Sequence, residues 1–84
     1  MKYTVVSTPL ADQQLAKIWL DALDQQGVSD AYNYIESRLK NNAHLLGRLH
    51  PSGWRVLAQP PLIVSFMVSE DDRLAKIISI DYRP

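Results

Sequence analysis

The sequence predicts a single α+β domain over residues 1–84, in which a helical hairpin packs on one face of a mainly antiparallel sheet. Three observations predict this class. The chain has 84 residues without cysteine, of which 46% are hydrophobic, so one core must hold the fold together without disulfides. Two neighbouring segments carry apolar residues at helical spacing. Three β-rich segments follow with short polar connections, which gives the order βααβββ.

The first strand is predicted over residues 2–7, which are rich in Tyr, Thr and Val. The pair Thr8-Pro9 then favours a helix start, because the threonine hydroxyl can accept from an unpaired backbone N–H and proline has no N–H to leave unpaired. Gly27 is predicted to end this helix. Its apolar stripe consists of Leu15, Ile18, Trp19, Ala22 and Leu23.

A second helix is predicted to begin at Ser29, whose hydroxyl can cap it. It should end at the pair Asn41-Asn42, because asparagine tolerates the left-handed conformation at a helix terminus. The link of residues 26–29 is short enough to make the two helices an antiparallel hairpin. The apolar stripe of the second helix consists of Ala31, Tyr32, Ile35 and Leu39.

Three strands are predicted at residues 54–59, 62–69 and 74–82. They are separated by Pro60-Pro61 and by the acidic turn 70–73. Both connections are too short for a parallel crossover, so consecutive strands should form antiparallel hairpins.

The middle strand is apolar on both faces, which is typical of a central strand that meets another surface on each side. One face carries Leu62, Val64, Phe66 and Val68. On the other face, Ile63 and Met67 are the candidates for binding a partner protein or a second copy of the chain.

The formal net charge is zero, with nine basic and nine acidic side chains, which excludes a broadly basic surface for nucleic acid. The charge is nevertheless polarised. Residues 1–36 have two basic against five acidic side chains, residues 37–58 have four basic and none acidic, and residues 59–84 have three against four. Phosphate contacts are therefore expected only in segment 37–58 and near Arg83. The alternative is a chance clustering of solvated side chains.

Motifs for phosphate-binding loops, zinc hydrolysis and serine nucleophiles are missing, and we expect no cofactor. His44 and His50 share no helical face with a carboxylate, and the chain has no cysteine, so no metal site is predicted. The acidic residues 70–72 should point into solvent at a hairpin tip. Because the chain shows neither a signal-peptide pattern nor an apolar run of about 20 residues, we expect no membrane association and a cytoplasmic location.

Segment 48–55 concentrates groups that suit a nucleic-acid partner. Arg48 and Arg55 supply fixed positive charge, His50 supplies an imidazole, and Trp54 supplies an aromatic face. The alternative is that Trp54 belongs to the core and that the arginines only aid solubility.

Arg83, with Tyr82 beside it, follows the last predicted strand. In a three-stranded meander, the start of one strand and the end of another can share an edge of the sheet. We therefore expect Arg55 and Arg83 to converge on one site.

Three features of the sequence resemble the RelE/ParE superfamily of small bacterial and archaeal toxins. They are the step Gly53-Trp54-Arg55 at the start of a strand, the apolar run 61–68 before an acidic turn, and the strand ending Tyr82-Arg83. Together with the order of segments, they cover nearly the whole chain. The resemblance implies a RelE/ParE-like βααβββ domain that serves as the toxin half of a type II toxin–antitoxin pair, bound by an antitoxin protein.

Within this superfamily, RelE-like members cut messenger RNA in the ribosomal A site without a metal, whereas ParE-like members poison DNA gyrase. For an mRNA interferase, the resemblance implies that His50 or Tyr82 exchanges a proton and that Arg55 and Arg83 clamp the phosphate. The activity would be that of a metal-independent endoribonuclease. The residues implied to contact RNA are Arg48, Trp54 and Arg55.

Ile63 departs from the family pattern, since cleaving members carry an arginine at this place in the central strand. The loss of one preorganised donor typically lowers a rate by about 10²–10³-fold. A second hypothesis is therefore a non-catalytic interaction module of the same fold, which binds an antitoxin, gyrase or a second copy in a homodimer. Ile63 and Met67 would carry that contact.

Overall fold

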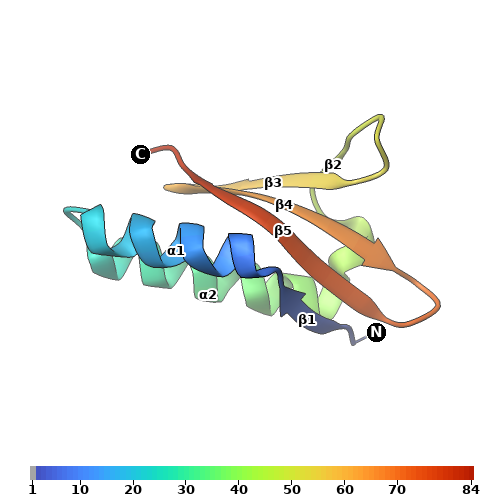
Figure 1. Ribbon diagram of the computed structural model, residues 1–84. Helices are drawn as coiled ribbons and strands as arrows, with labels where there is room; N and C mark the ends of the chain where they lie inside the picture. The colour runs from blue at the N-terminus through green and yellow to red at the C-terminus, as the bar shows by residue number, and fades with distance from the viewer. Residues whose placement is uncertain (1) are drawn as a thin grey trace.

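The computed structural model describes residues 2–84 and consists of two helices packed on one face of a five-stranded sheet (Figure 1). The sheet has the order β1-β5-β4-β3-β2. The predicted α+β class and the order βααβββ are confirmed, with one additional two-residue strand after the helices. The elements are β1 (Thr4–Ser7), α1 (Pro9–Asp21), α2 (Gln25–Asn42), the short 3-10 helix η1 (Ala43–Leu45), β2 (Arg48–Leu49), β3 (Arg55–Gln59), β4 (Leu62–Ser69) and β5 (Leu74–Tyr82).

Helix α1 begins as the sequence predicts. The Thr8 hydroxyl accepts from the backbone N–H of Ala11 at 3.1 Å, and Pro9 occupies the first turn. The helix ends at Asp21, however, because the backbone of Ala22 turns to an extended conformation. The predicted end at Gly27 is therefore wrong.

Helix α2 begins four residues before the predicted cap. The Asp24 carboxylate accepts from the backbone N–H of Gly27 at 2.9 Å, which satisfies one of the unpaired donors of the first turn. Gly27 and Ser29 both lie inside the helix as a result, so the predicted cap at Ser29 is wrong. The end at Asn42 agrees with the prediction.

Strands β3, β4 and β5 form an antiparallel meander, as predicted. Strand β1 adds to the outer edge of β5 in parallel, with Thr4 opposite Leu74 and Ser7 opposite Ile77. A register shift between Ser65 and Phe66 leaves one extra residue on β5, which changes the side-chain alternation along this strand.

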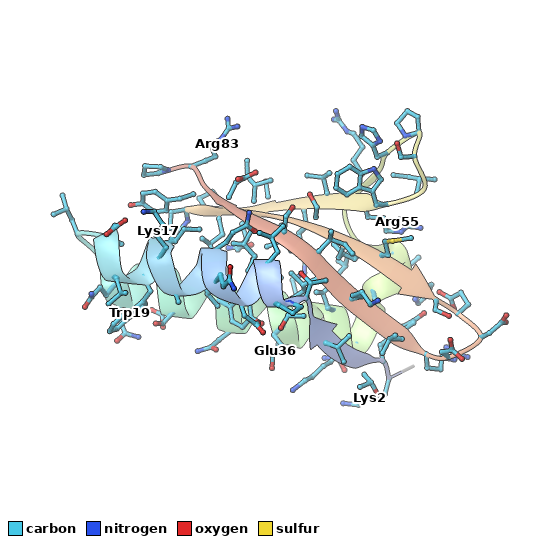
Figure 2. The ribbon with its side chains drawn as sticks, viewed as in Figure 1. Lys2, Lys17, Trp19, Glu36, Arg55 and Arg83 are labelled. Atoms are coloured by element: carbon cyan, nitrogen blue, oxygen red, sulfur yellow. The ribbon has the colours of Figure 1, made fainter. Side chains whose placement is uncertain are left out.

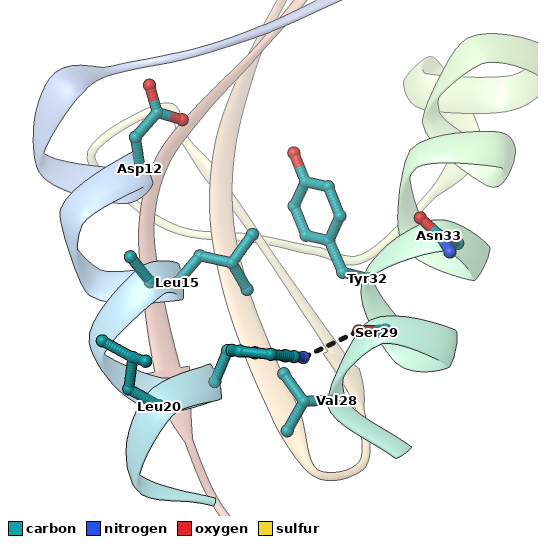
Figure 3. Close-up of a pocket in the computed structure, with 9 residues that line it drawn as sticks. Asp12, Leu15, Leu20, Val28, Ser29, Tyr32 and Asn33 are labelled. Carbon is teal, nitrogen blue, oxygen red and sulfur yellow. Dashed lines mark hydrogen bonds between the residues drawn. The ribbon is translucent and has the colours of Figure 1, made fainter. Parts of the chain in front are cut away.

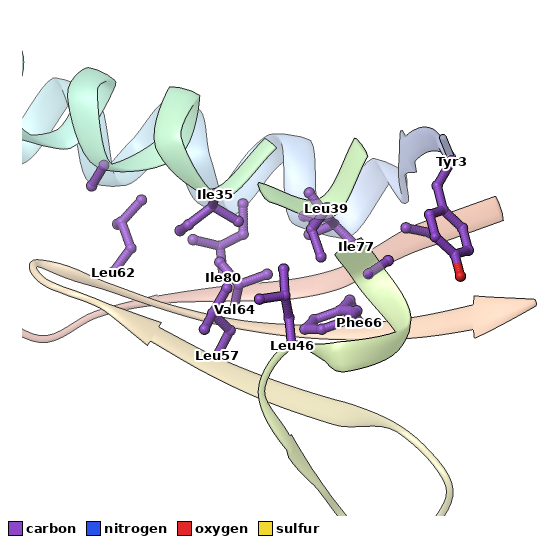
Figure 4. Close-up of a cluster of buried hydrophobic side chains, with 14 of the residues drawn as sticks. Tyr3, Ile35, Leu39, Leu46, Leu57, Leu62, Val64, Phe66, Ile77 and Ile80 are labelled. Atoms are coloured by element: carbon purple, nitrogen blue, oxygen red, sulfur yellow. The ribbon is translucent and has the colours of Figure 1, made fainter. Parts of the chain in front are cut away.

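The core lies between the helices and the sheet (Figure 4). Leu62, Val64 and Phe66 on β4 are fully buried, as the predicted inward face requires. They meet the apolar stripe of α2, which buries Val28, Ala31, Ile35 and Leu39. Burying one such large aliphatic or aromatic side chain stabilises a fold by about 1.5–3 kcal/mol. The helices thus cover one face of the sheet only, and the face turned away from them carries no second layer among residues 2–84 (Figure 1).

Candidate functional site

We call the uncovered side of the sheet the open face. Residues directly opposite one another on neighbouring strands place their side chains on the same face. One row across the open face runs from Arg48 through Val56 and Ser65 to Ser79. A neighbouring row on β4, β5 and β1 contains Met67, Lys76 and Val6.

Trp54 extends the second row toward the edge of the sheet. It directly precedes Arg55, which is opposite Phe66. Since side chains alternate between the two faces, Trp54 lies on the open side, next to the position of Met67. The Met67 side chain is about half exposed, at 49%. This end of the open face therefore presents an indole and a thioether as an accessible apolar surface.

Two cations flank that surface. Arg48 and Lys76 are both exposed, and no ion pair joins either to a carboxylate within residues 2–84. They lie on β2 and β5, three strands apart, which corresponds to about 14 Å at the usual strand spacing. The arrangement can attract an anionic chain and present an aromatic ring to it.

The loop between β2 and β3 is fixed around His50. The Nδ1 atom of His50 accepts from the backbone N–H of Ser52 and from the indole N–H of Trp54, both at 3.1 Å. The imidazole and indole rings meet edge to face at 5.3 Å. The structure thus brings together three of the predicted site residues, Arg48, His50 and Trp54.

Arg55 does not belong to this group. Because it is opposite Phe66, its side chain lies on the helix side of the sheet. There its guanidinium donates to the backbone carbonyl of Leu46 at 3.3 Å, which ties the segment before β2 to β3. The predicted role of Arg55 as a phosphate ligand stays a prediction, and the contact observed for it is a structural one.

The predicted convergence of Arg55 and Arg83 is wrong. Strands β3 and β5 both run antiparallel to β4, so they are parallel to each other, and the start of β3 lies beside the start of β5. Arg55 aligns with Ile77 through Phe66, whereas Arg83 follows the far end of β5, about 20 Å away along the strand. Figure 2 shows the two arginines at opposite ends of the sheet.

Tyr82 lies at the same far end as Arg83. It is opposite Leu62, and the Arg83 backbone N–H donates to the Pro61 carbonyl at 2.6 Å. His50 and Tyr82 therefore cannot act on one phosphate at the same time. Ile63 lies between these two ends of β4, on the open face beside Ala58 and Asp81.

Lys76 was not predicted as a site residue. A single lysine in a strand matches no motif, and its partners on the open face, Met67 and Val6, come from two other strands. The sequence contains an indication of its position. The adjacent Ile77 and Ile78 separate Lys76 from the polar positions 79 and 81, so polar and apolar residues do not alternate strictly along this strand. That irregularity marks the register shift on β5 and places Lys76 on the open face.

A second candidate site lies between the helices, on the opposite side of the molecule from the open face. It is a groove of about 530 Å³ between α1 and α2 (Figure 3). The indole N–H of Trp19 donates to the Ser29 hydroxyl at 3.0 Å and bridges the two helices across the groove. The groove is mostly apolar and is lined by Leu15, Ala16, Trp19, Leu20, Val28 and Tyr32, with Asp12, Ser29 and Asn33 as polar members.

The groove carries one acidic side chain, Asp12. Lys17 pairs with Asp21, and Lys40 pairs with Glu36, each one turn apart along its helix. Asp12 forms no ion pair within the described part of the chain. Burial, followed by the nearby Glu36 carboxylate, raises the pKa of the Tyr32 hydroxyl above its ordinary value. These features favour a ligand with an apolar surface and positive charge.

Tyr3 anchors the start of the chain to the turn between β4 and β5. Its hydroxyl donates to the Glu70 carboxylate, at 2.9 and 3.0 Å from the two oxygens, and the Arg73 guanidinium lies 5.7 Å from its ring centre. Burial and the hydrogen bond to Glu70 raise the pKa of Tyr3. His44 packs against the same ring at 5.7 Å. Since the Tyr3 side chain is buried, this cluster is a structural anchor rather than an open site.

Two classes of feature are missing from residues 2–84. No group of three or more His, Asp or Glu side chains could hold a metal ion there. No helix in this range combines the length and the apolar character needed to cross a membrane.

Comparison with known proteins gives matches at the level of structure. No protein-family model and no curated protein matches the chain. A chain of the toxin–antitoxin complex RelBE2 from Mycobacterium tuberculosis matches with a TM-score of 0.80 and 17% identity, over 99% of this chain and 93% of that chain. A chain of the chromosomal ParDE system from P. aeruginosa matches with a TM-score of 0.76 and 18% identity, over 99% of this chain and 98% of that chain. A chain of the archaeal RelE–RelB complex from Pyrococcus horikoshii OT3 matches with a TM-score of 0.60 and 14% identity, over 99% of this chain and 97% of that chain.

The layer architecture first defines the class, a two-layer α+β domain with a helical hairpin on one face of a mixed sheet. The structural matches then define the fold within that class. The chain has the RelE/ParE-like toxin fold over almost its entire length.

Proposed function

We propose that this protein is the toxin component of a toxin–antitoxin pair and that it acts on RNA through its open face. The observation that carries the proposal is the likeness to chains of three toxin–antitoxin complexes over 99% of this chain. The open face supplies what an RNA partner needs, namely two unpaired cations beside a partly buried indole and a half-exposed thioether.

Binding has more support than cleavage. The four residues expected to catalyse do not meet, because Arg55 faces the helices and the end of β5 is distant from His50. Apolar Ile63 lies on the open face between the two ends. An mRNA interferase of ordinary strength needs a charge stabiliser near the reacting phosphate. A toxin that binds RNA or the ribosome with little cleavage fits this arrangement best.

The experiment is induction of the chain in bacteria, followed by growth and by messenger RNA cleavage in translating extracts. We expect growth arrest with the unchanged chain and its loss in the double variant Arg48→Ala, Lys76→Ala. The matched control is Lys17→Ala, Lys40→Ala, which removes the same charge from two exposed helix positions and should keep the arrest. If neither the unchanged chain nor the control slows growth, the toxin proposal is wrong.

A second candidate function is that of a non-catalytic protein-binding module, with gyrase or another protein as target. The separation of the predicted catalytic residues favours it. The same experiment distinguishes the two: growth arrest that persists in Arg48→Ala, Lys76→Ala, without RNA cleavage, would indicate a protein target. Ile63→Glu, Met67→Glu should then abolish the arrest.

The antitoxin is proposed to occupy the groove between α1 and α2. Its binding segment should be an amphipathic one with apolar anchors and a basic side chain, because the groove is mostly apolar and Asp12, which lines it, forms no ion pair within residues 2–84. Co-expression of the chain with a small protein encoded beside its gene should give a stable complex. Leu20→Arg should break that complex, whereas Leu45→Arg should not. Both leucines are 70% exposed, but only Leu20 lines the groove. Equal effects of the two substitutions would exclude the groove.

A further inference from the structure

The geometry of the loop between β2 and β3 points to a positioning role for His50. We propose that His50 holds Trp54 as a stacking surface for one base of a single-stranded RNA, and that Arg48 and Lys76 bind the phosphates on either side. This inference rests on the proposed action on RNA, and it gives His50 a task different from the proton transfer that the sequence predicts.

The hydrogen bonds of the His50 imidazole carry the argument. Its Nδ1 atom is an acceptor for two N–H groups, those of Ser52 and Trp54. A nitrogen that accepts in this way has no proton of its own, which assigns the ring hydrogen to Nε2. The lone pair that a general base would use is therefore already engaged by the loop.

The backbone of the loop supports the same geometry. The His50 N–H donates to the Trp54 carbonyl at 2.6 Å, and the Gly53 N–H donates to the His50 carbonyl at 2.9 Å. With the two bonds at Nδ1, four hydrogen bonds connect His50 to Ser52, Gly53 and Trp54. The indole ring is also held from its edge by the imidazole, at 5.3 Å. Trp54 is thus fixed before any ligand arrives.

A fixed indole suits a base more than it suits a protein side chain at this place. Every nucleobase has a face that can stack on an aromatic ring, and a preorganised ring loses little conformational entropy on binding. Arg48 lies on β2, the edge strand that neighbours β3. Lys76 lies on β5, two strands from β3 on its other side. A chain crossing the strands would therefore meet a cation, the aromatic surface and a second cation in turn.

The test uses a fluorescein-labelled single-stranded decaribonucleotide and fluorescence anisotropy. We expect Trp54→Ala and His50→Ala each to weaken binding by about tenfold, the effect of losing one stacked base. His50→Asn should restore binding to within about twofold, because its side-chain oxygen can accept in place of Nδ1. Circular dichroism of each variant checks that the fold is retained.

A second measurement separates positioning from direct contact. In a Trp19→Phe background, Trp54 is the only tryptophan, so its emission reports on the loop without ligand. His50→Ala should shift that emission, and His50→Asn should leave it unchanged.

Three outcomes would overturn the inference. The first is unchanged binding by His50→Ala. The second is weak binding by His50→Asn with native Trp54 emission, which would mean that the imidazole itself contacts the RNA. The third is no binding of the oligonucleotide by the unchanged chain. Capture of the antitoxin by the groove between α1 and α2 does not depend on this loop geometry, so it tests the proposed toxin–antitoxin pairing separately.

Discussion

At the scale of single residues, Tyr3 should make stability sensitive to alkaline pH. Burial and Glu70 raise its pKa in the folded state, so above about pH 10 the unfolded chain loses this proton first. The stabilisation from neutral Tyr3 is therefore fully present below about pH 10 and is lost as the pH rises through the folded-state pKa. Urea unfolding of the unchanged chain and of Tyr3→Phe should give a stability difference that shrinks above this pH. A difference independent of pH would contradict this account.

Gly47 and Gly53 both have positive φ angles, 74° and 95°, but their surroundings differ. A Cβ atom at position 47 would lie 2.7 Å from the backbone carbonyl oxygen of Val56, whereas at position 53 nothing lies within 4 Å. We expect Gly47→Ala to destabilise the fold by about 2–3 kcal/mol and Gly53→Ala by about 1 kcal/mol. Thermal unfolding of the two variants measures the difference. Equal losses would mean that the close contact with β3 is unimportant.

Individual site residues were only partly predictable from the sequence. Arg48, His50 and Trp54 are close in the chain, so a hairpin brings them together whatever the rest of the fold does. The pairing of Arg55 with Arg83 depended on strand direction, and alternate strands of a meander run parallel rather than antiparallel. Which side of the sheet Arg55 occupies depended on the register, which the sequence does not state.

At the scale of elements, Asp24 sets the start of α2. Asp24→Ala should lower the free energy of unfolding by about 1 kcal/mol, because the Gly27 N–H loses its acceptor. Ser29→Ala should change it by less than about 0.5 kcal/mol, since its hydroxyl is a partner of Trp19 and caps no helix. Chemical denaturation measures both variants. A larger effect at Ser29 than at Asp24 would indicate that Ser29 caps the helix, as the sequence predicts.

The elements differ in how far the sequence determines them. The long strands and the helical stripes follow from apolar periodicity, because the same residues form the core. The start of α2 does not follow from this periodicity. Asp24, Gly27 and Ser29 are all residues typical of helix boundaries, and they lie within six positions of one another. Strand β2 has two residues, too few for any periodic pattern, and it exists only because β3 offers an edge to pair with.

At the scale of the whole molecule, zero net charge conceals two opposite binding preferences. The open face carries the cations Arg48 and Lys76, and the groove on the other side is lined by the carboxylate of Asp12; none of the three forms an ion pair within residues 2–84. An RNA and a basic protein segment could therefore bind at the same time without direct competition. Any neutralisation by a groove-bound antitoxin would then require a further segment of that protein to reach the open face.

Salt dependence tests the number of cations involved. Two phosphate contacts should give a slope of about −1.4 for the logarithm of RNA affinity against the logarithm of salt concentration. Lys76→Ala should reduce it to about −0.7, and Lys17→Ala should leave it unchanged. Anisotropy titrations between low and moderate salt measure these slopes. A slope near zero for the unchanged chain would show that phosphates are not bound here.

The parallel pairing of β1 with β5 has a consequence for synthesis. Thr4 is made 70 positions before its partner Leu74. Until β5 exists, β1 has no strand to join, β4 lacks one neighbour, and the core lacks Ala75, Ile77 and Ile80. Contacts between such distant positions form late and slowly. A nascent or prematurely terminated chain that lacks β5 should therefore be inactive and sensitive to proteolysis. The folded protein should form only after β5 has been synthesised.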